Sequence, residues 1–405
     1  MTAPTSAPPY AVGDRVEART GPIAHGGHVV ARVRPPGADP EERDVVVFVR
    51  HALPDERVVV EITETGRTFL RGDAVEVLEA SPDRVSAPCP LAHPGGCGGC
   101  DFQHVALPAQ RGLKAQVVAE QLQRLAGLEW DVVVEPVPVA EGAPDDGLGW
   151  RTRMQYVTLP GGGRGLRKHR SHDVIEVDRC LIAAPDARTT TVSASGGGRP
   201  APTATTTVVE HVLGRDFTVA ADGFWQVHPQ APRVLVEAVL EALAPRPGER
   251  ALDLYAGVGL FSAFLAEAVG RAGGVVSVES DRRASELAGE NLAAFPQAAI
   301  RSGRVDRVLE QGFGSRRSLS GGGVDLVVLD PPREGAKRKV VEAIAGLGPR
   351  AVAYVACDPA ALARDVAYFA EAGYRLAGLR AFDLFPMTHH VECVALLVPT
   401  AGADR

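Results

Sequence analysis

The chain has 405 residues, a formal net charge of −7 and 45% hydrophobic residues. This length allows two or three domains with buried cores, and no apolar run is long enough to span a membrane. The negative net charge argues against a nucleic-acid-binding protein whose whole surface is strongly basic. A local basic groove remains compatible with this charge. Met1 to Pro9 lack the charged and apolar segments of a signal peptide, so we expect a monomeric cytoplasmic protein that binds no membrane.

Residues 8–80 contain short β-prone runs that alternate with turn residues. The runs cover 15–18, 29–33, 45–49, 57–62 and 74–78. Short strands at this spacing predict a small β-barrel of the oligonucleotide-binding (OB) type. A structural cap without a ligand is the alternative interpretation.

Residues 86–222 have a mixed pattern, which predicts a small α+β domain. Apolar residues recur at helical spacing over 108–126, so we expect a helix there. Strand-like runs follow at 132–134 and 154–159.

Residues 223–400 alternate between strand and helix. Strands are predicted over 250–255, 275–279, 326–330, 351–356, 374–382 and 391–398, and helices over 232–244, 261–269, 282–294, 337–346 and 360–372. This alternation predicts an α/β, doubly wound (Rossmann-like) domain, whose ligands bind at the carboxyl ends of the strands.

A glycine-rich turn, Asp253-Leu254-Tyr255-Ala256-Gly257-Val258-Gly259, ends the first of these strands and opens a helix. A dinucleotide-binding turn would carry a third glycine near the position of Ser262, so a pyrophosphate site is poorly supported. The next strand ends in Glu279, an acidic residue placed to accept the hydroxyls of a ribose. Together these features resemble the first motifs of S-adenosylmethionine-dependent methyltransferases. A tight turn without a ligand is the alternative.

Three later motifs indicate methyl transfer to a carbon atom. Asp330-Pro331-Pro332-Arg333, Cys357 and Glu392 each lie at a predicted strand end. Carbon 5 of a pyrimidine becomes nucleophilic only after a thiolate adds to carbon 6, and a base must then remove the proton from carbon 5. The chemistry therefore requires one cysteine and one carboxylate within reach of one ring.

Taken singly, these residues have simpler interpretations. Cys357 alone would be a buried core cysteine, and Glu392 alone a surface carboxylate. A predicted helix start follows Cys357 at Asp358-Pro359, and we expect it to lower the pKa of the thiol. The neighbouring Cys393 should face the other side of its strand and belong to the core.

Four further cysteines are candidate metal ligands: Cys89, Cys97, Cys100 and Cys180. Four thiolates suit either a cubane iron–sulfur cluster or a tetrahedral zinc ion, and free thiols are the third possibility.

A basic segment without acidic residues covers 147–172. Its cationic residues are Arg151, Arg153, Arg164, Arg167, Lys168 and Arg170. Such a run is usually a solvated surface. Near a site that modifies a nucleobase, we favour contact with RNA phosphates.

These motifs, together with Phe224-Trp225-Gln226-Val227 and His390-Val391-Glu392, resemble the uracil-carbon-5 RNA methyltransferases. The resemblance is to the branch with an N-terminal TRAM domain and an iron–sulfur cluster, which modifies 23S ribosomal RNA. It implies a TRAM barrel at 8–80, a central cluster domain at 86–222 and a methyltransferase domain at 223–400. The gap between Cys89 and Cys97 is seven residues instead of the usual five, and Asp358 replaces a common asparagine.

The resemblance also implies roles for individual residues. Cys357 would be the nucleophile and Glu392 the proton acceptor. S-adenosylmethionine would contact Gln226, Tyr255, Glu279 and Asp330. Cys89, Cys97, Cys100 and Cys180 would hold a [4Fe–4S] cluster, with zinc as the alternative. The expected partner is ribosomal RNA, with transfer RNA as the second candidate substrate. A non-catalytic RNA-binding or assembly factor of the same fold, and a redox or radical iron–sulfur enzyme, are the competing functions.

Overall fold

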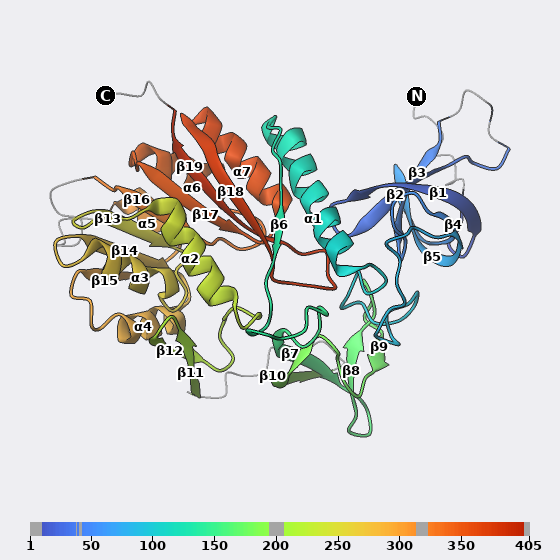
Figure 1. Cartoon of the computed structure of the whole chain (residues 1–405), viewed down its shortest axis with the longest axis horizontal. Helices are drawn as coiled ribbons and strands as arrows, with labels where there is room; N and C mark the ends of the chain where they lie inside the picture. Colours follow the sequence, from blue (N-terminus) through green and yellow to red (C-terminus); the bar gives the residue numbers. More distant parts are fainter. Residues whose placement is uncertain (1–9, 38, 40–42, 194–205, 313–322, 401–405) are drawn as a thin grey trace, which may run out of the picture.

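The computed structural model describes residues 10–37, 39, 43–193, 206–312 and 323–400. From the N-terminus the chain builds a β-barrel, a long helix, a small β-rich region and a large α/β domain (Figure 1). Within the described residues, no helix is both long and apolar enough to cross a membrane.

The N-terminal strands close into a barrel in the order β1-β2-β3-β5-β4. Their bounds are β1 Arg15–Ala24, β2 His28–Val33, β3 Val45–Arg50, β4 Arg57–Thr65 and β5 Phe69–Glu79. Alternate residues such as Val47, Val49, Val58 and Val60 are fully buried, because successive side chains of a strand point to opposite faces. The predicted five-stranded barrel is confirmed.

Helix α1 (Leu107–Gln121) connects the barrel to the α/β domain. It starts with Pro108 in its first turn and continues into a π-helical turn η1 (Leu122–Ala126), which ends at Gly127 with φ 65°. Leu113 and Val117 pack in the barrel core, whereas Val118 packs in the core of the α/β domain. The helix predicted over 108–126 is therefore present, with its last turn widened.

A four-stranded sheet in the order β10-β7-β8-β9 and a separate hairpin, β11-β12, follow in the chain. Their bounds are β7 Arg151–Thr158, β8 Arg164–Arg167, β9 Val174–Glu176, β10 Ala183–Ser193, β11 Thr207–Val212 and β12 Arg215–Ala220. Only β7 was predicted. The other strands carry many charged residues and threonines, and β10 is half-exposed along its length, so no clear apolar period marks them.

The α/β domain is built on an eight-stranded sheet in the order β15-β14-β13-β16-β17-β19-β18-β6. Its strands are β6 Val134–Pro136, β13 Arg250–Leu254, β14 Gly274–Glu279, β15 Ala298–Ser302, β16 Leu326–Leu329, β17 Ala351–Ala356, β18 Tyr374–Asp383 and β19 Glu392–Pro399. Its helices are α2 Ala231–Leu243, α3 Leu260–Val269, α4 Arg282–Asn291, α5 Val305–Gln311, α6 Lys337–Gly346 and α7 Pro359–Glu371. The predicted α/β class is confirmed; β15 and α5 were not predicted.

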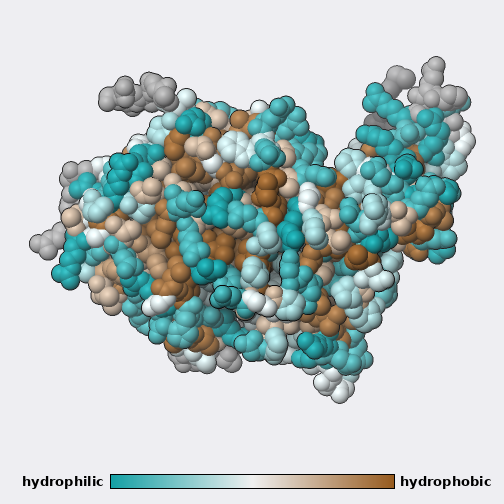
Figure 2. Space-filling model, viewed as in Figure 1, coloured by the Kyte–Doolittle hydropathy of each residue, from teal (hydrophilic) through white to brown (hydrophobic). Residues whose placement is uncertain are grey.

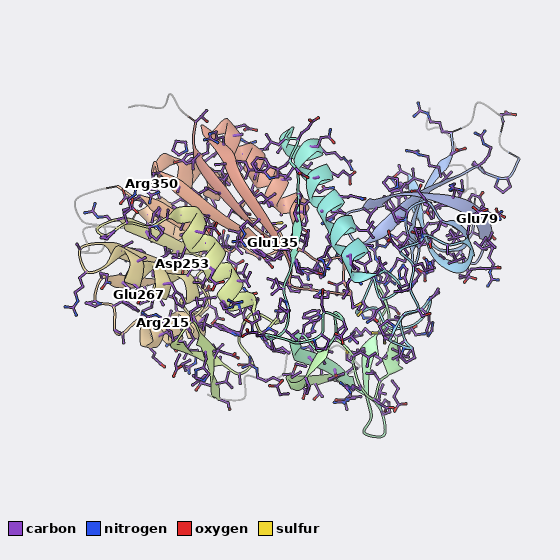
Figure 3. All side chains as sticks on the ribbon, in the orientation of Figure 1. Glu79, Glu135, Arg215, Asp253, Glu267 and Arg350 are labelled. Carbon is purple, nitrogen blue, oxygen red and sulfur yellow. The ribbon has the colours of Figure 1, made fainter. Side chains whose placement is uncertain are left out.

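Strand β6 belongs to this sheet although it lies in the segment expected to form the central domain. It pairs in parallel with β18, and Arg380 on β18 forms an ion pair with Glu135, at 2.7 Å. Figure 3 labels Glu135 beside β18. The segment before the predicted boundary at residue 223 thus contributes to the core of the α/β domain.

The parallel strands β13, β14, β16 and β17 end at one edge of the sheet, and antiparallel β19 starts there. Side chains at these ends meet in one place because parallel strands share their carboxyl edge. In Figure 2, hydrophobic residues reach the surface between hydrophilic ones over this domain.

Candidate active site

A cavity of about 1440 Å³ lies at this edge of the sheet. All six predicted catalytic and donor-binding residues line it: Gln226, Tyr255, Glu279, Asp330, Cys357 and Glu392. Five of them lie at the ends of sheet strands, so the strand order brings these together, and Gln226 joins them from the segment between β12 and α2.

The glycine-rich turn after β13 forms one end of the cavity. Tyr255, Gly257 and Gly259 have positive φ of 64°, 56° and 89°. For Tyr255 this conformation is strained, which is common where a backbone is shaped around a ligand. Ser262, in place of a third glycine, donates a hydrogen bond of 2.6 Å from its hydroxyl to Asp253 Oδ2. Asp253, labelled in Figure 3, is fully buried on β13, and burial raises its pKa to about 7.

Glu279, at the end of β14, braces this turn. One carboxylate oxygen accepts the N–H of Gly257 at 2.9 Å, and the other accepts the N–H of Asp281 at 2.6 Å. The Ser280 hydroxyl also donates to Glu279 Oε1, at 3.2 Å. Each carboxylate oxygen can accept two hydrogen bonds, so Oε2 retains capacity for a ribose hydroxyl, and a second hydroxyl would replace that of Ser280. The predicted acidic strand end therefore lies beside the glycine-rich turn.

Cys357 and Glu392 occupy the other end of the cavity, on paired strands. Ala356, the last residue of β17, pairs with Cys393 on antiparallel β19. Cys357 follows Ala356 and Glu392 precedes Cys393, so Cys357 and Glu392 lie opposite each other at the same end of this pair. Cys357 is partly buried, whereas Glu392 is only 4% exposed. Cys393 is fully buried in the core, as predicted.

The expectation of a lowered pKa for the Cys357 thiol is wrong. Burial, followed by the charges of Glu392 and Asp330, raises the pKa of Cys357 to about 12, although Arg333 opposes this effect. Helix α7 starts only two residues later, yet burial outweighs its dipole. Formation of the Cys357 thiolate therefore depends on the charges of Glu392, Asp330 and Arg333.

The two carboxyl groups near Cys357 favour their neutral forms. Burial and the nearby Asp253 raise the pKa of Asp330 to about 7. Burial, together with Asp330, raises the pKa of Glu392 well above its usual value. Two close carboxyl groups in a site of low polarity do not both ionise easily, so protons stay in the cavity at neutral pH.

Arg333 and His390 extend the site beyond the residues selected from sequence. The Arg333 Nη2 atom lies 3.2 Å from His390 Nε2, and both residues line the cavity. Burial, then the charges of His389 and Arg333, lowers the pKa of His390 to about 3, so its ring is neutral. The sequence marked both residues as parts of motifs but gave no sign that they meet.

The four other cysteines line a second cavity, of about 390 Å³. Among the described residues, no group of three or more His, Cys, Asp or Glu side chains is arranged to hold a metal ion. The N–H of Gly99 points to Cys97 Sγ at 3.4 Å, and the Gln103 amide to Cys100 Sγ at 3.4 Å. Such N–H donors stabilise thiolates and cluster sulfurs.

The basic segment is only partly available for RNA. Arg153 donates hydrogen bonds to the carbonyls of Gly223 and Asp222, and Arg164 donates to the carbonyl of Asp178. Arg167 donates to the carbonyl of His172 at 3.0 Å. Arg151 donates to the carbonyl of Arg153 at 3.1 Å. Four of the six predicted cations thus hold the fold, a role that their sequence pattern did not reveal.

The family profile described as tRNA (Uracil-5-)-methyltransferase matches residues 208–400, and that of the TRAM domain matches residues 10–75. A protein of Streptomyces avermitilis named as an uncharacterized RNA methyltransferase is 46% identical, over 96% of this chain and 99% of its own length. The 23S rRNA (uracil(1939)-C(5))-methyltransferase RlmD of Alkalilimnicola ehrlichii is 32% identical, over 86% of this chain and 91% of its own length. The chain belongs to the RNA (uracil-5-)-methyltransferase family. It is an S-adenosylmethionine-dependent RNA methyltransferase with an N-terminal TRAM domain.

A solved structure supports the fold assignment. The tRNA (uracil-54, C5)-methyltransferase of Pyrococcus abyssi, in complex with S-adenosyl-L-homocysteine, superposes with a TM-score of 0.65 and 21% identity. The match covers 95% of this methyltransferase and 100% of that chain. The two proteins thus share a fold over nearly the whole length of this chain.

Proposed function

We propose that this methyltransferase methylates carbon 5 of a uridine in 23S ribosomal RNA through a covalent adduct on Cys357. The observation that carries the proposal is the pairing of β17 with β19, since it presents Cys357 and Glu392 to one cavity beside Asp330. A cysteine and a carboxylate facing one flat ring are what the carbon-5 reaction needs.

In the first step the Cys357 thiol loses its proton to solvent, and the thiolate sulfur then forms a bond to carbon 6 of the uracil. The electron pair of the 5,6 double bond moves towards carbon 5 and the carbonyl at carbon 4, which makes carbon 5 nucleophilic. Arg333 lowers the pKa of the Cys357 thiol and so assists the thiolate. Its charge also favours the enolate that forms when sulfur adds.

Carbon 5 then takes the methyl group, and the proton it carries must leave. Bound S-adenosylmethionine supplies the methyl group and leaves as S-adenosylhomocysteine. Because its raised pKa favours the neutral form, Glu392 must first release its own proton to solvent. Its carboxylate then accepts the carbon 5 proton, and the electron pair of the broken C–H bond re-forms the double bond as the sulfur departs. The raised pKa of Glu392 suits it to take and hold this proton.

The donor would bind along the opposite end of the cavity. Glu279 would accept the ribose hydroxyls, and Gln226, Tyr255 and Asp330 would contact the rest of the donor. The glycine-rich turn after β13 supports this assignment, because its positive φ angles let the backbone approach the ligand closely.

Cys89, Cys97, Cys100 and Cys180 would hold a [4Fe–4S] cluster with a structural role. All four thiols line one cavity, and N–H groups of Gly99 and Gln103 point to two of the sulfurs. Four thiolates also suit a tetrahedral zinc ion, so zinc is the alternative. The sequence resemblance to the iron–sulfur branch of the family favours the cluster.

Ribosomal RNA is favoured over transfer RNA by the 32% identity to the 23S rRNA enzyme over most of both chains. The transfer RNA alternative is supported by the family description of the profile that matches residues 208–400. Mapping of 5-methyluridine in ribosomal and transfer RNA from a deletion strain separates the two. Loss of the base from transfer RNA alone would reject the ribosomal assignment.

The covalent step is tested with an RNA that carries 5-fluorouridine, whose fluorine cannot be removed as a proton. The wild-type enzyme with S-adenosylmethionine should give a complex stable to denaturing electrophoresis, and Cys357→Ala should give none. Cys393→Ala is the matched control, since Cys393 is buried and faces the core. A complex that persists in Cys357→Ala rules out the adduct.

A further inference from the structure

The turn between β1 and β2 of the barrel lies against both segments that carry the proposed catalytic residues. His25 Nε2 is 3.1 Å from Asp358 Oδ2, next to Cys357 in the chain. On the other side, a Cβ at Gly27 would lie 2.7 Å from His389 Cβ, just before His390 and Glu392. Only glycine, with its φ of 78°, fits this close approach. The barrel is thus in contact with the active site itself.

A buried network fixes this contact. Asp101, which follows Cys100, accepts the ring N–H of His389 at 2.6 Å and its backbone N–H at 3.2 Å. Arg50, on β3 of the barrel, approaches the same carboxylate at 3.5 Å. Barrel, cysteine-rich segment and catalytic domain therefore meet around Asp101, and the turn that carries His25 is held in one place.

Asp358 has two tasks at this junction. Its Oδ1 atom accepts the N–H of Ala361 at 2.8 Å and so caps helix α7, while Oδ2 faces His25. A carboxylate beside the nucleophile has a cost, because its negative charge disfavours a thiolate at Cys357. A positive charge on His25 would offset this cost without disturbing the cap.

We propose that His25 of the TRAM barrel is a positioning residue for the methyl transfer: its imidazolium pairs with Asp358, neutralises that charge and holds the Cys357 segment. This inference rests on the proposed role of Cys357 as nucleophile. It makes the barrel part of the catalytic apparatus as well as an RNA-binding module.

The charge states fit this role. The hydrogen bond to Asp358 raises the pKa of His25 above its usual value, against the effect of burial and with help from Glu120. For Asp358, burial opposes ionisation, but the hydrogen bonds from His25 and from backbone N–H groups lower its pKa. The titratable and charged groups around the pair are Glu120 and Lys114 on α1, Cys357, His389 and His390.

The sign of the pH effect follows from these shifts. A histidine whose pKa is raised in the folded state gives its full stabilisation below its ordinary pKa of 6.5. This stabilisation is lost as the pH rises through the pKa of the histidine in the folded state. Asp358 stays ionised over that range. The advantage that His25 gives to adduct formation should therefore be largest in mildly acidic solution and fade above neutrality.

The test measures single-turnover methylation of ribosomal RNA from a strain that lacks the enzyme, with saturating RNA and donor, between mildly acidic and alkaline pH. His25→Gln keeps a hydrogen-bond donor but has no charge. We expect it to be about three- to fivefold slower than wild type at the acidic end, the effect of one partly exposed ion pair, and equal to wild type at the alkaline end. His211→Gln is the matched control, since His211 forms a similar pair with Asp216 at the turn of the β11-β12 hairpin, and neither of these two residues lines the active-site cavity.

A double-mutant cycle separates the role from simple RNA contact. Asp358→Asn keeps a cap for α7 and removes the charge. His25→Gln should then have no further effect on the rate in this background. If His25→Gln slows both backgrounds equally, or weakens RNA binding in both, the positioning role is rejected. The 5-fluorouridine adduct of the wild type, measured in parallel, reports on the proposed function separately: its absence rejects the Cys357 mechanism, whereas its presence with an unchanged His25→Gln profile rejects only this inference.

Discussion

Lys114 Nζ lies 2.6 Å from Asp383 Oδ1, and the two side chains are 0% and 2% exposed. The ammonium group also donates to the carbonyl of Phe385 at 3.0 Å. Lys114 belongs to α1 and Asp383 ends β18, so this buried pair anchors the connecting helix to the catalytic sheet. Phe385 lies in the segment between β18 and β19 that leads to Glu392, which ties the anchor to the active site.

Lys114→Met should therefore destabilise the protein strongly. It leaves the carboxylate of Asp383 buried without its cation, a change that costs about 3–5 kcal/mol. The free energy of unfolding from urea denaturation measures this loss. The double variant Lys114→Met/Asp383→Leu should recover most of it, since an apolar pair of similar volume can replace a buried ion pair. Equal destabilisation in the single and double variants would show that packing, and not the unpaired charge, dominates.

The sequence predicted the catalytic domain well but not this junction. The strands β13, β14, β16 and β17 are short apolar runs bounded by turn residues, and such runs are visible locally. Four of the six site residues, Tyr255, Glu279, Asp330 and Cys357, lie at the ends of those strands, so strand order brings these four into one cavity. Contacts such as His25 with Asp358 join residues 333 positions apart and leave no local pattern. The pKa of Cys357 was mispredicted for a related reason, because burial depends on packing by distant segments.

Glu392→Gln should separate the two halves of the reaction. Cys357 can still add to the uracil ring, but the proton on carbon 5 has no acceptor, so the sulfur cannot leave after methyl transfer. With ordinary RNA and S-adenosylmethionine, we expect turnover to fall by at least about 100-fold, in the range of a lost general base. A covalent RNA–protein complex should accumulate on denaturing gels. Glu241→Gln, an exposed residue paired with Arg380, is the control. Full turnover in Glu392→Gln would remove this residue from the mechanism.

Glu279→Gln should weaken donor binding with little effect on the fold. The amide retains one acceptor oxygen, so it cannot brace both Gly257 and Asp281 while accepting the two ribose hydroxyls. We expect the Kd for S-adenosylmethionine to rise about tenfold, the effect of one or two lost hydrogen bonds to a charged group, as measured by isothermal titration calorimetry. Glu267→Gln, which affects only an exposed pair with Arg215, should bind the donor as the wild type does. An unchanged Kd in Glu279→Gln would place the ribose elsewhere.

Asp253 should make the stability of the ligand-free protein depend on pH. Burial raises its pKa to about 7 from an ordinary value of 3.8, so the folded state binds a proton that the unfolded state has already released. Stability should therefore decrease as pH rises from about 4 to about 7 and level off above, because folding then has to bury the carboxylate. Asp253→Asn keeps an acceptor for the Ser262 hydroxyl and removes the charge, so its free energy of unfolding should change less over this range. Urea denaturation at both ends of the range gives the comparison, with Asp216→Asn, exposed on the β11-β12 hairpin, as the control. A slope that Asp253→Asn leaves unchanged would assign the pH dependence to Asp330 and Glu392, the other buried carboxyl groups of the cavity.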